Sequence, residues 1–201
     1  MNSSVLIPRP ETEVEQVLAM AGTRDVVTGP IIDLCCGSGV IGVVLAKETG
    51  LSVVGIDISW TALEVAKVNR ERLCRDEKLR FIQGDLMDCI HVQEGLSLIV
   101  SNPPYVEHSA LNGILAPEVN YFDPWVALDG GNDGMDILRK IRLQAAMKLR
   151  KGGQLFMEIG MEQGKALHKL FLGQYQSSPG FSRVSVLQDY AGRDRVLVAT
   201  K

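Results

Sequence analysis

The sequence has few aromatic residues and few histidines, and its charges nearly balance. Only 5% of the 201 residues are aromatic, three are histidine, and 24 acidic residues stand against 21 basic ones. A nucleic-acid groove is usually lined by basic residues interleaved with aromatic ones, and a net charge of −3 provides no overall attraction to phosphates. We therefore expect no direct nucleic-acid partner. The scattered histidines predict no metal site.

Long hydrophobic runs and spaced cysteine pairs are also missing. No apolar stretch approaches the roughly 18–20 residues that a membrane-spanning helix needs, and the N-terminus has no charged head followed by an apolar signal-peptide core. The four cysteines include the adjacent Cys35 and Cys36 but no Cys-x-x-Cys spacing of zinc or redox sites. We expect a cytoplasmic protein with reduced thiols and without membrane contact. The oligomeric state stays open.

What the chain does contain is an alternation of short apolar runs and amphipathic stretches. Near-continuous runs of Ile, Val, Leu and Phe are typical of strands covered on both faces, and they occupy residues 30–34, 51–57, 79–83, 96–101 and 154–159. Helical patterns cover residues 14–21, 40–48, 61–73 and 137–149. Two final strand-like runs, 182–186 and 195–200, predict an antiparallel pair. Repeated strand–helix units predict a doubly wound α/β sheet with ligands at the carboxyl ends of its strands.

Local signals mark two helix boundaries and one irregular stretch. Thr61 and Glu64 have the spacing of a capping box at the start of a helix. Lys151-Gly152-Gly153 is expected to end the helix over 137–149. Residues 103–133 contain Pro, Gly, Asn and Asp throughout and show no sustained period. Such a long irregular stretch in a compact domain is usually a lid or a binding loop.

The first apolar run leads into a tight glycine turn that opens a helix. Its sequence is Asp33-Leu34-Cys35-Cys36-Gly37-Ser38-Gly39, and glycine lets backbone approach a ligand where a Cβ would clash. Gly42 completes a Gly-x-Gly-x-x-Gly pattern, so a nicotinamide-dependent dehydrogenase is one alternative. The acidic Asp33 at the strand end and the short helix favour a different ligand.

Acidic residues follow two more predicted strands. Asp57 ends the run 51–57, where a carboxylate can accept hydrogen bonds from both hydroxyls of a ribose. Asp85 follows the run 79–83, where a carboxylate can meet the exocyclic amine of adenine. Together with Asp33, these acids favour an adenosine ligand without a phosphate, and S-adenosylmethionine is the commonest cofactor of that kind.

The run 96–101 leads into Asn102-Pro103-Pro104-Tyr105, whose residue types suit methylation of a planar nitrogen. The nitrogen lone pair of an amide or aromatic amine is delocalised, so fixed acceptors are needed to orient its N–H groups. Asn102 Oδ1 and the Pro103 carbonyl can be those acceptors, while the prolines restrain φ and remove competing donors. Tyr105 offers a flat face to the planar group. Methyl transfer then depends on orientation and desolvation and needs no strong base.

Two of these segments resemble the motifs of class I methyltransferases: the glycine turn, and Gly55-Ile56-Asp57. Asn-Pro-Pro-Tyr resembles the motif of methyltransferases acting on planar nitrogen. The resemblance implies a three-layer, Rossmann-like α/β fold with a mostly parallel seven-stranded sheet and a C-terminal antiparallel strand. It also implies that the methionine part of S-adenosylmethionine lies along the turn. Its ribose is expected to bind Asp57, and its adenine is expected to lie beside Asp85-Leu86. The cofactor-binding residues expected on this basis are Asp33, Cys35, Cys36, Gly37, Ser38, Gly39, Asp57, Ile58, Asp85, Leu86 and Asn102. Asn102, Pro103 and Tyr105 are the expected catalytic residues, and with Pro104 they are expected to bind the substrate.

Three further segments resemble the HemK/PrmC family, the protein-glutamine N5-methyltransferases of peptide-chain release factors. They are residues 5–13, the stretch 118–128 continuing through 130–134, and the ending 189–195. Asp123 stands where the family usually has Glu. The resemblance implies that Asn102 to Tyr105 grip the glutamine amide of a Gly-Gly-Gln loop in a release factor, and that the irregular segment receives that loop. Arg9 and Glu11 fit either an arm near the active site or a solvated surface.

The resemblance covers nearly the whole chain, so we expect residues 1–201 to be a single catalytic domain. The helical N-terminal docking domain that is usual in the family is expected to be absent. The leading hypothesis is N5-methylation of the release-factor glutamine, although the particular release factor stays open. The alternatives are adenine-N6 methylation of DNA or RNA, which shares Asn-Pro-Pro-Tyr but usually needs a basic surface, and a cofactor-binding module with reduced activity.

Overall fold

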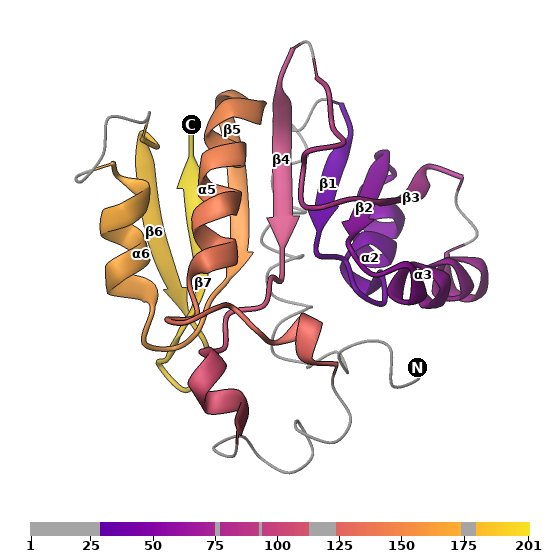
Figure 1. The fold of residues 1–201 in the computed structure, drawn as a ribbon. Helices are drawn as coiled ribbons and strands as arrows, with labels where there is room; N and C mark the ends of the chain where they lie inside the picture. The colour runs from indigo at the N-terminus through magenta and orange to yellow at the C-terminus, as the bar shows by residue number, and fades with distance from the viewer. Residues whose placement is uncertain (1–28, 75–76, 93, 113–123, 174–179) are drawn as a thin grey trace.

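The computed structural model describes residues 29–74, 77–92, 94–112, 124–173 and 180–201. Their strands are β1 (Ile31–Leu34), β2 (Val53–Asp57), β3 (Leu79–Gln83), β4 (Leu96–Ser101), β5 (Leu149–Glu158), β6 (Arg183–Gln188) and β7 (Asp194–Thr200). They form one seven-stranded sheet in the order β3-β2-β1-β4-β5-β7-β6 (Figure 1). Neighbours among β1 to β5 pair in parallel, whereas β7 is antiparallel to both β5 and β6. The predicted fold class is confirmed, and so is the antiparallel pair at the end of the chain.

Helices cover both faces of this sheet (Figure 1). They are α2 (Val40–Thr49), α3 (Trp60–Leu73), α5 (Asp136–Lys148) and α6 (Gly164–Phe171). Because successive strand residues point to opposite faces, the sheet has two cores. Ile32 and Ile99 pack in a cluster with residues of α5 and α6, whereas Ile31 and Val100 pack in a second cluster with residues of α2.

β1 and its two neighbours in the sheet, β2 and β4, end level with one another. Leu34 of β1 pairs with Ile56 of β2 on one side and with Ser101 of β4 on the other. The loops that follow these strands therefore lie at one edge of the sheet, the lower edge in Figure 1, where the arrow of β4 ends. Ligands of open α/β sheets bind at such an edge, where the order of the strands reverses.

The predicted capping box of α3 is wrong by two residues. Ser59 caps this helix, and its Oγ accepts a hydrogen bond from the Ala62 N–H at 3.3 Å. Thr61 already lies within the helix, with its Oγ1 2.9 Å from Ser59 Oγ. The helix starts earlier because Asp57 Oδ1 accepts the Ser59 N–H at 2.9 Å and turns the chain directly after β2.

The predicted end of the helix over 137–149 is also wrong. α5 ends at Lys148, and Lys151-Gly152-Gly153 lies inside β5. Leu149 already pairs with Leu96, and the register shifts before Leu98 pairs with Gln154. Gly152 has a φ of +79°, and a Cβ on Gly153 would lie 2.6 Å from the Leu96 carbonyl oxygen. These glycines therefore permit an irregularity in the strand and do not end the helix.

The irregular stretch 103–133 contains little regular structure in its described parts. It holds the short 3₁₀ helices η1 (His108–Asn112) and η2 (Trp125–Ala127) and an isolated bridge between Val106 and Asp129. The predicted arm at 5–13, with Arg9 and Glu11, the predicted helix at 14–21 and Asp123 lie outside the described residues. Within the described ranges, no helix has the length and apolar character that crossing a membrane requires.

Candidate functional site

A pocket of about 330 Å³ opens at the carboxyl ends of β1, β2 and β4. Ten of the residues expected to bind cofactor or substrate line it: Cys35, Cys36, Gly37, Ser38, Asp57, Ile58, Asp85, Leu86, Asn102 and Pro104. Asp33, Gly39, Pro103 and Tyr105 were also expected in the site, but they do not line the pocket. The volume falls in the range typical of small-molecule sites.

The glycine turn between β1 and α2 forms one wall of the pocket. Cys35, Gly37 and Gly39 all have positive φ angles, of 57°, 51° and 74°. A Cβ on Gly39 would lie 2.9 Å from the Ala66 Cβ, so this glycine allows the turn to pack closely against α3. The turn thus exposes backbone of Gly37 to the pocket, while Gly39 supports it from behind.

Asp57 is the carboxylate best placed to bind a ligand. Its Oδ2 accepts the Gly37 N–H at 2.8 Å and its Oδ1 accepts the Ser59 N–H at 2.9 Å. Burial raises the pKa of Asp57, although these backbone hydrogen bonds oppose the shift. An ionised carboxylate offers about four acceptor positions, so positions remain for the two hydroxyls of a ribose.

Asp33 is fully buried beneath the turn. Its Oδ2 accepts the Gly42 N–H of α2 at 2.8 Å, and its Oδ1 has no hydrogen-bond partner among the described residues. Burial raises the pKa of Asp33 to about 7, and the nearby Asp57 carboxylate adds to the shift. Asp33 therefore links β1 to α2 from outside the pocket.

Apart from the carboxylates Asp85 and Asp129, the remaining walls are mostly apolar. Burial raises the pKa of the Cys35 and Cys36 thiols well above the usual range, so both stay protonated near neutral pH. Ile58 lines the pocket but is 54% exposed, and its side chain offers an open apolar surface beside Asp57. Leu86 adopts a positive φ of 50° at the opposite wall. Strained backbone of this kind often occurs at ligand sites.

The Asn-Pro-Pro-Tyr segment divides between the pocket and its support. Asn102 and Pro104 line the pocket, whereas Pro103 is buried. The Tyr105 hydroxyl donates a hydrogen bond to Glu158 Oε1, at the end of β5, at 2.8 Å. This contact directs the Tyr105 hydroxyl toward β5, and the packing of the Tyr105 ring against the substrate stays a prediction.

Sequence reasoning did not single out Asp129, which also lines the pocket. Its carboxylate accepts the Gly131 N–H at 2.9 Å and lies 2.9 Å from His108 Nδ1. The hydrogen bond from the Gly131 N–H makes the larger contribution, and together the two contacts hold the pKa of Asp129 below its usual range. The only signal in the sequence was its position between two segments that carried the family resemblance. Val126 and Ala127, which lie in the first of those segments, are further pocket residues without an assigned role.

Among the described residues, no three His, Cys, Asp or Glu side chains gather as a metal site would require. The pocket has the features of an organic-ligand site: carboxylates at Asp57, Asp85 and Asp129, backbone exposed at a glycine turn, and apolar side chains between them.

Comparisons with known proteins agree with this geometry. Residues 16–119 match the family described as Methyltransferase small domain. Over 98% of its length, the chain is 40% identical to the release factor glutamine methyltransferase of Thermosynechococcus vestitus and 37% identical to that of Thermodesulfovibrio yellowstonii, covering 67% and 69% of those proteins. Its fold is similar to that of the human METTL16 catalytic domain solved with an RNA hairpin. That match has a TM-score of 0.74 and 13% identity, and it covers 100% of this chain and 74% of the other.

Proposed function

Because this chain belongs to the family of release factor glutamine methyltransferases, we propose that it transfers a methyl group to the side-chain nitrogen of a glutamine in a release factor. The enzyme class is an S-adenosylmethionine-dependent N-methyltransferase. The proposed target is the glutamine of the Gly-Gly-Gln loop, and the proposed compartment is the cytoplasm, where release factors act on ribosomes.

The pocket residues fit the chemistry of S-adenosylmethionine. Asp57 keeps acceptor positions for ribose hydroxyls after binding Gly37 and Ser59. Ile58 and Leu86 provide apolar surface for a flat ring, and the protonated Cys35 and Cys36 bring no negative charge. When bound, S-adenosylmethionine supplies an electrophilic methyl group on a positively charged sulfur.

The chain's own contribution to catalysis is orientation. Asn102 lies in the pocket wall beside the glycine turn, so its Oδ1 and the adjoining Pro103 carbonyl are the proposed acceptors for the two N–H groups of the substrate amide. These contacts would hold the amide plane and direct its nitrogen toward the pocket. Correct alignment of two reactants can supply a large part of a rate enhancement, and the proton leaves once nitrogen has gained the methyl group.

The observation that carries this proposal is the position of Asn102 and Pro104 in the same pocket as Asp57 and the glycine turn. The register of β1, β2 and β4 produces this arrangement, since all three strands end level. The proposed sites for an adenosine cofactor and for a planar amide are therefore adjacent. The identity to release factor methyltransferases supports glutamine over adenine as the planar group.

A labelling experiment tests the proposal. The purified chain is incubated with methyl-labelled S-adenosylmethionine and an intact release factor, the same factor with its Gly-Gly-Gln glutamine replaced by alanine, or DNA and RNA. We expect label in the intact factor alone. Label in nucleic acid, or equal label in the two release factors, would contradict the proposed substrate.

A further inference from the structure

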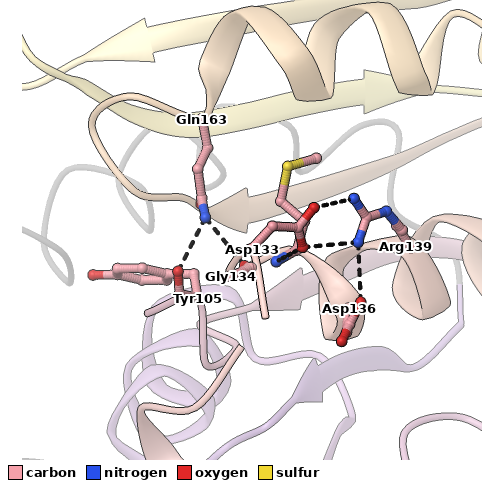
Figure 2. Close-up of polar contacts among 7 residues, drawn as sticks. Tyr105, Asp133, Gly134, Asp136, Arg139 and Gln163 are labelled. Atoms are coloured by element: carbon pink, nitrogen blue, oxygen red, sulfur yellow. Dashed lines mark hydrogen bonds and ion pairs between the residues drawn. The ribbon is translucent and has the colours of Figure 1, made fainter. Parts of the chain in front are cut away.

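The side chain of Gln163, between β5 and α6, contacts both ends of the long connection from β4 to α5 and also its own loop. Its Nε2 donates hydrogen bonds to the carbonyl oxygens of Tyr105 at 3.0 Å and Gly134 at 3.1 Å (Figure 2). Its Oε1 accepts the Gly160 N–H at 2.8 Å. A glutamine amide has two N–H donors and one carbonyl oxygen. All three groups of Gln163 are therefore used to connect backbone segments.

The Gly134 loop is shaped to accept this contact closely. Gly134 has a φ of +69°, and a Cβ there would lie 2.5 Å from the Tyr105 carbonyl oxygen and 2.9 Å from Gln163 Nε2. Only glycine fits at position 134, between the Tyr105 carbonyl oxygen and Gln163 Nε2. A Cβ on Gly130 would likewise lie 2.7 Å from the Gly134 carbonyl oxygen. The glycines of the segment 130–134, which sequence analysis noted only by resemblance, thus permit the loop to meet Tyr105.

An ion-pair network holds the same loop on its other side. Arg139 Nη1 donates to Asp133 Oδ1 at 2.9 Å and to Asp136 Oδ1 at 3.0 Å, and Arg139 Nη2 also contacts Asp133 Oδ2 (Figure 2). Arg139 and Asp136 belong to α5. The loop is thus joined to α5 on one side and to Gln163 on the other.

Tyr105 is held at both of its ends by residues near the end of β5. Its carbonyl oxygen accepts from Gln163, and its hydroxyl donates to Glu158, which is only 2% exposed. Tyr105 follows Pro103 by two residues. Because only Pro104 separates the two residues, the position of Tyr105 constrains the path of the chain at the Pro103 carbonyl and Asn102, the two proposed acceptors of the substrate amide.

We infer that Gln163 is a positioning residue for methyl transfer: it fixes Tyr105 against Gly134 and so sets where Asn102 and Pro103 hold the amide. The inference rests on the proposed function for its catalytic consequence. Gln163 does not line the pocket, so it acts indirectly, through Tyr105. A misplacement of about 1 Å in a reacting group can cost roughly 100-fold in rate, which is the scale expected when this contact is lost.

The test compares Gln163→Ala and Gln163→Glu with the wild type. Glutamate keeps the size of the side chain and the acceptor for Gly160 but loses both N–H donors. Gln188→Ala is the matched control, because the Gln188 side chain donates to Asp194 in an exposed contact at 3.2 Å and does not line the pocket. We expect both Gln163 variants to lower kcat toward a release factor by about 10- to 100-fold. The calorimetric Kd for S-adenosylmethionine should change by less than roughly threefold, and Gln188→Ala should match the wild type.

Hydrogen exchange provides a readout that does not depend on the substrate. The Val106 N–H donates to the Leu128 carbonyl, and the Gly130 N–H donates to the Val106 carbonyl. In the Gln163 variants both amides should exchange at least about tenfold faster, because their loop contacts open more often. Amides of β1 and β2 should keep their wild-type protection.

The possible outcomes distinguish a failure of the proposed function from a failure of the inference about Gln163. A wild-type chain that fails to label any release factor contradicts the proposed function, and the exchange measurement then decides the inference. Unchanged exchange at Val106 and Gly130 overturns it, as does wild-type kcat in both Gln163 variants where the wild type is active. A wild-type rate in Gln163→Glu with a slow Gln163→Ala also overturns it, because the donors would then be dispensable.

Discussion

The replacement Asp33→Asn should change how the stability of this protein depends on pH. Asp33 is fully buried, its Oδ2 accepts the Gly42 N–H at 2.8 Å, and it lies near the second carboxylate Asp57. Burial raises the pKa of Asp33 from 3.8 to about 7 in the folded protein. Asparagine has the same size and can still accept the Gly42 N–H, but it does not titrate.

The sign of the effect follows from the protons bound in each state. Between about pH 4 and pH 7 the folded protein keeps a proton on Asp33 that the unfolded chain has lost. Stability is therefore highest below the unfolded pKa and is lost as the pH rises through the folded pKa. Each unit of difference corresponds to about 1.4 kcal/mol. Ionisation of Asp33 thus lowers the free energy of unfolding by about 4 kcal/mol as the pH rises from below the unfolded pKa to above the folded pKa.

Urea unfolding at pH 5, 6, 7 and 8 measures this contribution. The free energy of unfolding of the variant minus that of the wild type should rise by about 2 kcal/mol from pH 5 to pH 7 and level off near pH 8. Taking the difference cancels the titration of all groups that the two proteins share. Parallel curves for the two proteins over this range would refute the reasoning, because they would mean that Asp33 is already ionised in the fold at pH 5.

Two further substitutions test the two halves of the site. Asp57→Asn removes the charge from the carboxylate that binds Gly37 and Ser59. It should weaken S-adenosylmethionine binding by about 10- to 100-fold in calorimetry, as expected for lost charge-assisted hydrogen bonds. The affinity of the wild type for the cofactor should fall as the pH drops through the raised pKa of Asp57, whereas the affinity of the variant should not depend on pH in this way. Undiminished cofactor binding by the variant would contradict the role of Asp57 in holding the ribose. Tyr105→Phe removes the hydroxyl that donates to the buried Glu158. It should lower the free energy of unfolding by about 1–3 kcal/mol in urea titrations with cofactor affinity retained, and an unchanged midpoint would contradict that anchoring role.

The sequence predicts the sheet well because its strands carry local signals. Runs of β-branched and apolar residues identified 79–83 and 96–101 with the boundaries that the structure has. The errors lie where tertiary pairing outweighs a local rule. Gly152-Gly153 has the composition of a helix end, but Leu149 is already paired with Leu96 and the glycines serve the irregularity in β5.

The candidate site shows the same division between local and long-range information. An acid at a strand end is visible in the sequence, but the face on which it lies is not. Asp57 and Asp33 both end predicted strands, yet Asp57 lines the pocket and Asp33 points beneath α2. Gln163 was not singled out from the sequence, because two of its three contacts are with residues 58 and 29 positions away. Only the fold brings those segments together.

The most direct test of the central account is mass spectrometry of a release factor after incubation with S-adenosylmethionine and either the wild-type chain or Asn102→Ala. We predict one methyl group on the glutamine of the Gly-Gly-Gln loop with the wild type. With Asn102→Ala, we predict a rate lower by roughly 100-fold while cofactor binding survives. Methylation at a different residue, or a wild-type rate in the Asn102→Ala variant, would contradict the account.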